Sequence, residues 1–170
     1  QVSRILTAAR QRGIVQISVA PYESRHEALE SRLIECFGLS RAIVIKLVDG
    51  ASTAQVRRTL GYFAGPLISE WLQPNSVVGL AGGRTLAELI RYVKTPATQR
   101  QGMTVVQLMG NVGPNVSEYD AAELCHLLVR RTSGVLYALS TPAFAPDART
   151  RDIFLAHTDL RYVWQLFNAM

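Results

Sequence analysis

The chain has 170 residues, which allows one domain of ordinary size, or one domain and a short extra segment, and excludes a large multidomain assembly. Hydrophobic residues make up 48% of it and charged residues 18%, so it can build a core and carries too little charge for a disordered tail. The net charge of +5 modestly favours phosphate or nucleic acid as a partner.

The two cysteines and the hydropathy pattern exclude further classes. Cys36 and Cys125 show no CxxC or Cys/His spacing, so neither a disulfide framework nor a metal site is indicated. The sequence contains no apolar run near the roughly 18 residues of a membrane span, and its first residues do not form a signal peptide. We therefore expect a cytoplasmic protein with no membrane contact.

The first 48 residues predict two helices and two strands. Apolar positions recur at helical spacing over residues 2–11, and the mostly β-branched residues 14–19 predict a strand. A second amphipathic helix is expected over residues 25–37, ended by Gly38, and an apolar strand over residues 42–48.

A long helix follows, which Ser52 or Thr53 can cap. Its expected buried stripe consists of large apolar residues: Val56, Leu60, Phe63, Leu67, Ile68 and Trp71. Three apolar strands are then expected over residues 77–81, 104–109 and 135–139, each followed by a loop and a helical segment. This alternation predicts an α/β domain with an open, mostly parallel sheet and helices on both faces.

Ligands of such sheets bind at the carboxyl ends of the strands, where the loops lie. The loop from Gly82 to Thr85 has the parts of a phosphate site, because two glycines let backbone amides approach an anion at a helix N-terminus. Arg84 and Thr85 would add a guanidinium and a hydroxyl. The loop fits neither the Walker A nor the dinucleotide pattern, so no cofactor is indicated, and a simple tight turn with a helix cap is the alternative.

The loop after the second strand could line the same crevice. Gly110 and Asn111 begin it, and an asparagine there could bind the hydroxyls of a polar ligand. An ordinary turn rich in Gly, Asn and Pro is the alternative.

No convincing catalytic set emerges from the sequence. His26, His126 and His157 have no partner suggested by spacing. Cys125 is expected to be a small buried residue, and the acidic residues Glu118, Asp120 and Glu123 fit a helix start better than an acid/base pair.

Arginines at the amino end suggest contact with DNA. Arg4, Arg10 and Arg12 flank the first helix, which runs into a strand as a recognition helix runs into a wing. A solvated basic face is the alternative.

Several of these segments resemble the SorC family of bacterial transcriptional regulators. Residues 2–15 resemble the end of that family's DNA-binding region, and residues 29–44 resemble the start of its effector domain. Residues 78–86, VGLAGGRTL, are similar to its V-G-x-x-W-G-x-T-L signature, with Gly82 in place of the tryptophan. Residues 105–110, VVQLMG, resemble its next strand and loop, with Asn111 in place of a second glycine, and residues 142–144 resemble a later proline loop.

This resemblance implies an effector domain related to sugar-phosphate isomerases that senses a phosphorylated sugar and is not an enzyme. It implies that Gly83, Arg84 and Thr85 hold the phosphate and that Gly110 and Asn111 line the sugar pocket, and Gly82 is expected among the ligand-binding residues. Ser3 and Arg4 are expected to contact DNA, and the full-length protein is expected to bind an operator as a homo-oligomer.

The same resemblance implies a domain division. Residues 1–20 would be the remnant of a helix-turn-helix DNA-binding domain, and residues 21–170 an effector domain cut short at its C-terminal end, because the family's members are longer. The alternative function is an isomerase-like enzyme acting on a sugar phosphate.

Overall fold

The computed structural model describes residues 24–94 and 102–168. The chain divides into two compact units, Gln1–Lys46 and Leu47–Met170. The predicted DNA-binding helix and strand, with Ser3 and Arg4, lie outside the described residues, as does the proposed domain boundary at residue 20.

Helix α2, Glu27–Phe37, forms most of the described part of the first unit. His26 caps its start, since its Nδ1 accepts a hydrogen bond from the amide of Leu29, and Gly38 ends it in the left-handed conformation, as the sequence predicted. Glu30 is buried on this helix, where its carboxylate binds the guanidinium of Arg25 at 2.6 Å and the amide of Val44 at 2.9 Å.

The strand predicted over residues 42–48 is wrong. Ile45 makes only an isolated antiparallel bridge with Arg25. The neighbouring bonds join the amide of His26 to the carbonyl of Val44 at 2.8 Å, and the amide of Lys46 to the carbonyl of Ser24 at 2.7 Å. Among the described residues the pairing is thus confined to Ser24, Arg25 and His26, and it stops on one side where α2 begins at Glu27.

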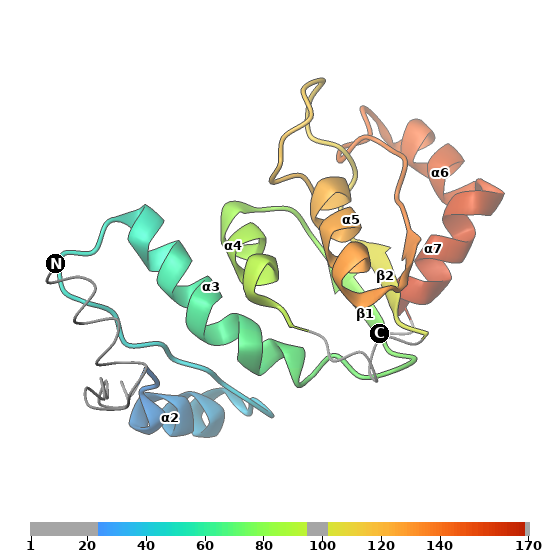
Figure 1. The fold of residues 1–170 in the computed structure, drawn as a ribbon. Coiled ribbons are helices and arrows are strands. Elements are labelled where there is room, and N and C mark those ends of the chain that lie inside the picture. The colour runs from blue at the N-terminus through green and yellow to red at the C-terminus, as the bar shows by residue number, and fades with distance from the viewer. Residues whose placement is uncertain (1–23, 95–101, 169–170) are drawn as a thin grey trace, which may run out of the picture. The chain divides into compact units, whose positions relative to one another are not determined.

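The second unit begins with helix α3, Thr53–Ser69, whose start is fixed by a capping box between Ser52 and Gln55. Its buried face differs from the predicted stripe of large residues, which are half-buried or, for Trp71, exposed. The buried residues are small: Gly61, Ala64, Gly65 and Ser69. They let α3 lie close against α4, Arg84–Tyr92, and Figure 1 shows these two helices side by side.

The sheet has three parallel strands in the order β1-β2-β3: Val77–Leu80, Thr104–Gln107 and Val135–Tyr137. In its register Val78 lies beside Val105, and Val106 lies beside Tyr137. All three strands were predicted, although β2 and β3 each end two residues early.

Helices follow each strand, as in an open α/β domain. Helix α5, Ala121–Thr132, follows β2, and α6, Ala148–Ala156, and α7, Thr158–Asn168, follow β3. Val105 packs into one hydrophobic core with α4 and α5. Side chains alternate between the two faces of a strand, so Val106 lies on the opposite face, where it is equally buried. Helix α7 also contacts β2. Both faces are therefore covered, which confirms the predicted fold class.

No helix within residues 24–94 and 102–168 is both long and apolar enough to cross a bilayer.

Candidate functional site

Three loops gather at one edge of the sheet because β1, β2 and β3 are parallel and adjacent. They begin after Leu80, after Gln107 and after Tyr137, and the first two carry the residues that the sequence predicted for ligand binding. In parallel sheets this carboxyl edge is where ligands bind.

The β1 loop is shaped by a close approach to the segment before α5. A Cβ atom added to Gly82 would lie 2.9 Å from the carbonyl oxygen of Tyr119 and 3.0 Å from the amide of Ala121. The amide of Gly83 donates to the same carbonyl at 2.8 Å. Any side chain at residue 82 would therefore require one of these two backbone segments to move.

Gly83 also sets the start of α4. Its φ of 139° and ψ of 150° lie in a region that only glycine adopts readily. It is the N-cap residue of α4, and no side chain caps the helix. The first amides of a helix have no partner within it, so those of Arg84 and Thr85 point outward at the positive end of the helix dipole.

Charged and aromatic side chains surround this helix start. Arg84 is exposed, and its guanidinium carbon lies 5.6 Å from the ring centroid of Tyr119, within cation–π range. A hydrogen bond to the carboxylate of Glu118 raises the pKa of Tyr119 above its usual value, with smaller contributions from the charge of Glu118 and from burial. Glu118 in turn lies 3.6 Å from Arg91, so its charge is balanced near the loop.

The β2 and β3 loops are joined through their backbones. Gly110 is buried, and a Cβ there would lie 2.6 Å from the carbonyl oxygen of Pro142. The amide of Asn111 donates to Thr141 at 2.8 Å, and Asn111 accepts from Ala143 at 2.9 Å. These bonds occupy the main chain of Asn111, and the residue is exposed.

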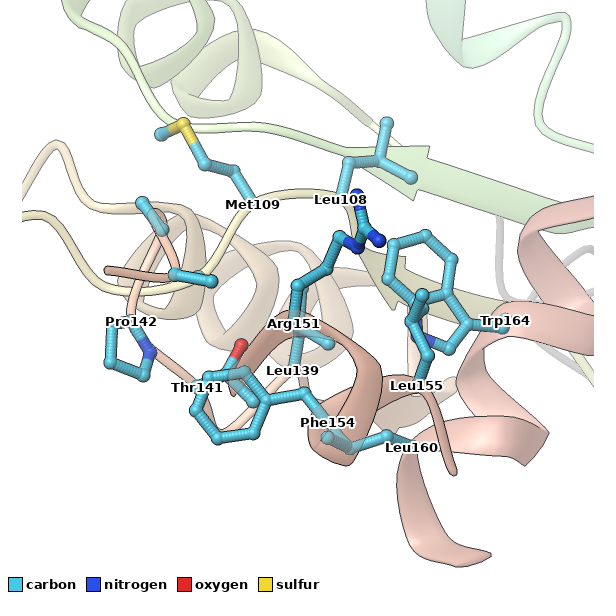
Figure 2. A pocket seen from close by; sticks show the side chains of 13 residues that line it. Leu108, Met109, Leu139, Thr141, Pro142, Arg151, Phe154, Leu155, Leu160 and Trp164 are labelled. Carbon is cyan, nitrogen blue, oxygen red and sulfur yellow. The ribbon is translucent and has the colours of Figure 1, made fainter. Parts of the chain in front are cut away.

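A pocket of about 250 Å³ opens between these two loops and helices α6 and α7. Gly110 is one of its lining residues. Figure 2 shows Met109 and Pro142 on one side of it and Trp164 on the other, with Arg151 reaching over an otherwise mostly apolar lining. The indole nitrogen of Trp164 is buried without a hydrogen-bond partner.

The predicted site residues thus form two groups. Gly82, Gly83, Arg84 and Thr85 form the β1 loop and the start of α4, and Gly110 and Asn111 lie on the neighbouring loop. The β3 loop pairs with Asn111 through an isolated bridge at Pro142, and it lines the pocket beside α6 and α7.

Of the side chains weighed as catalytic groups, Cys125 is buried, Asp120 makes a local hydrogen bond and His126 is exposed. Burial raises the pKa of the Cys125 thiol to about 12, so it is protonated at neutral pH. His126 is exposed on α5, and the carboxylate of Asp120 accepts a hydrogen bond from the amide of Ser117. Among the residues that the structure describes, no three His, Cys, Asp or Glu side chains are grouped as metal ligands.

Two residues of this edge were missed by the sequence analysis. Tyr119 closes the β1 loop, and its only signal was its place just before a helix start. Gln107 is buried at the end of β2, where a lone polar residue ending an apolar strand is an unusual choice that could have been noticed.

Comparison with known proteins identifies relatives over most of the chain. A family model described as "Putative sugar-binding domain" matches residues 23–170. The sorbitol operon regulator of Klebsiella pneumoniae is 25% identical over 151 residues, which are 89% of this chain and 48% of that protein. The deoxyribonucleoside regulator of Bacillus subtilis is 31% identical over 122 residues, which are 71% of this chain and 38% of that protein.

A solved structure shares the fold. The crystal structure of the full-length sorbitol operon regulator SorC from K. pneumoniae superimposes with a TM-score of 0.79 at 22% identity, covering 99% of this chain and 55% of that one. The chain therefore spans about half the length, or less, of these relatives.

Proposed function

The chain belongs to this family of sugar-binding domains, and we propose on that premise that it is the effector-sensing domain of a sugar-responsive transcriptional regulator. The effector is a phosphorylated sugar, bound at the carboxyl edge of the sheet. Its binding changes how the full-length protein, as a cytoplasmic homo-oligomer, holds its operator DNA.

The start of α4 is the observation that carries the phosphate part of this proposal. Its first amides lack a side-chain cap, they stand at the positive end of a helix dipole, and the exposed Arg84 and Thr85 flank them. Phosphate binds such helix starts through backbone N–H groups, with an arginine as a charge-assisted donor. Gly83 leaves the approach open, since nothing lies within 4 Å of where its Cβ would be.

The neighbouring loop supports the sugar part. Because β2 lies directly beside β1, Asn111 follows the strand adjacent to the phosphate site. A side-chain amide offers both donors and acceptors, which suits the hydroxyl groups of a sugar. The names of the relatives point to sorbitol and to deoxyribonucleosides, so polyol and pentose phosphates are the first compounds to examine.

Coupling to DNA requires two arrangements of the protein that bind the effector with different affinity. Ser3 and Arg4 remain the proposed DNA contacts at the amino end.

The test is a thermal-shift panel on the 170-residue chain, with sorbitol 6-phosphate, deoxyribose 5-phosphate, the two unphosphorylated compounds and inorganic phosphate. A ligand at 100 times its dissociation constant adds about 2.7 kcal/mol of stability, or about 8 °C at this chain length. We expect shifts from phosphorylated compounds only. The absence of a shift with any of them would refute the proposal.

Two variants locate the site. Arg84→Ala should weaken phosphate-ester binding about tenfold or more, because a charge-assisted contact of about 1.5–3 kcal/mol is lost. Arg130→Ala is the control, because it removes the same charge at an exposed position in the last turn of α5, whereas the first turn of α5 follows Tyr119 and the β1 loop contact. This variant should leave binding of the phosphate ester unchanged. Equal losses in both variants would mean that only net charge matters.

The same samples discriminate sensing from catalysis. Incubation with the bound sugar phosphate, followed by NMR of the small molecule, should return it unconverted. Turnover would instead support an isomerase-like enzyme, which the shared architecture allows.

A further inference from the structure

Gln107 is a buried amide at the point where β2 ends. It is 2% exposed and follows Val105 and Val106, which are fully buried. A polar side chain in such surroundings costs stability unless its hydrogen bonds are made. Its purpose must therefore lie in the groups that it contacts.

Both ends of this amide bind main-chain atoms. The Nε2 of Gln107 donates to the carbonyl of Met109 at 2.7 Å, and its Oε1 accepts from the amide of Leu139 at 3.0 Å. One bond therefore reaches along the β2 loop and the other crosses to the β3 loop.

These two bonds span a gap in the backbone pairing. The β2–β3 ladder ends at the pair Val106 and Tyr137, and backbone bonds between the loops resume with the amide of Asn111 and the carbonyl of Thr141. Between these points the strands separate, and the Gln107 side chain connects them. This also explains why both strands end two residues before the apolar pattern does.

The segment held in this way carries the proposed sugar contacts. The bond to Met109 fixes the peptide group before Gly110, which is pressed against Pro142, and Asn111 follows directly. The β1 loop is held by a different group, the carbonyl of Tyr119, which lies just before α5 and accepts from the amide of Gly83 at 2.8 Å. Loss of the Gln107 hydrogen bonds should consequently alter the proposed sugar contacts and leave the proposed phosphate contacts unchanged.

We propose that Gln107 is a positioning residue of the effector site, which holds the loops after β2 and β3 in the one arrangement that presents Asn111 to the sugar. This inference rests on the proposed function. It adds that recognition of the sugar and recognition of the phosphate depend on different parts of the structure.

The experiment compares two probes by calorimetry: inorganic phosphate, and whichever of sorbitol 6-phosphate or deoxyribose 5-phosphate binds the unaltered chain more tightly. Gln107→Met keeps the length of the side chain and removes both hydrogen bonds. We expect about a tenfold loss of affinity for the sugar phosphate and no loss for inorganic phosphate. Gln165→Met, the same change at an exposed position on α7, should affect neither.

Gln107→Glu provides a second measurement if the methionine variant fails to fold. An ionised carboxylate can still accept from Leu139 but repels the carbonyl of Met109, whereas a protonated one restores both bonds. The affinity of this variant for the sugar phosphate, relative to the unaltered chain at the same pH, should therefore recover as the pH falls. A constant ratio across pH would overturn the inference.

The remaining outcomes separate the two proposals. If the unaltered chain binds neither sugar phosphate, the proposed function fails. If it binds one, and the Gln107 variants lose both probes equally or neither, the proposed function stands and the positioning role is refuted.

Discussion

The close approach at Gly82 predicts that a single added methyl group will disturb the proposed phosphate site. In Gly82→Ala the new Cβ would lie 2.9 Å from the carbonyl oxygen of Tyr119 and 3.0 Å from the amide of Ala121, whereas ordinary contact begins at 3.4 Å. Both neighbours are backbone atoms, so one segment must move by about 0.5 Å, the difference between 2.9 and 3.4 Å.

The magnitude follows from two contributions. Overpacking of this kind costs about 1–3 kcal/mol, and the bond from Gly83 to the same carbonyl, worth about 1 kcal/mol, is strained with it. A loss of about 2–3 kcal/mol lowers the midpoint of thermal unfolding by about 6–9 °C in a chain of this length.

The assay is thermal unfolding followed by circular dichroism, together with binding of inorganic phosphate. Gly113→Ala is the matched control, because that glycine has a φ of 75° with nothing within 4 Å of its Cβ position, so only the backbone cost of about 1 kcal/mol is expected. If Gly82→Ala unfolded at the same temperature as the unaltered chain and bound phosphate equally well, the close-approach argument would be wrong.

Three further predictions concern other parts of the chain. Gly61→Ala should lower the free energy of unfolding, measured in urea, by about 1–2 kcal/mol, because its Cβ would lie 2.6 Å from the carbonyl oxygen of Glu88 on α4. Arg58→Ala, on the exposed side of α3, is the control and should change this free energy little. The pKa of Glu30 is lowered chiefly by its hydrogen bond to Arg25, so its stabilising effect is present above the unfolded carboxyl pKa and is lost as the pH falls through the folded pKa. Hydrogen exchange of the Val44 amide, which binds Glu30, should accelerate below about pH 4.5 relative to the intrinsic rate, and Glu30→Gln should remove that dependence. Iodoacetamide at pH 8 should label the exposed Cys36 and leave the buried Cys125 unlabelled, because burial raises the pKa of the Cys125 thiol to about 12. Mass spectrometry of the protein labelled in its native state measures both rates. Equal rates at the two cysteines would contradict the burial of Cys125.

Much of the fold could be predicted because its signals are local. The helix ends at Gly38 and Ser52 follow from capping chemistry, and the three apolar strands with a helix after each predict a parallel sheet. The loop from Gly82 to Thr85 was placed correctly between β1 and α4 for the same reason.

The errors arose where the outcome depends on tertiary partners. Residues 42–48 have the composition of a strand, but within the described part of the chain they form only an isolated bridge, between Ile45 and Arg25. The packing of α3 is set by Gly61 and Gly65, because α4 approaches closely there, and no periodicity of large residues can show this. The contact of Tyr119 with the β1 loop joins residues 36 positions apart, counting from Gly83, and is likewise invisible to local patterns.

The β1 loop and the loops after β2 and β3 are held in different ways, and this difference bears on how the proposed sensor could change its effector during evolution. Main-chain atoms of Gly83 and Tyr119 shape the β1 loop, so most side-chain substitutions leave that shape intact. The loops after β2 and β3 are held by backbone bonds at Asn111 and, in addition, by the side chain of Gln107. Under the proposed function, a lineage could therefore acquire a different sugar by substitutions around β2 and β3 while the proposed phosphate site stays unchanged.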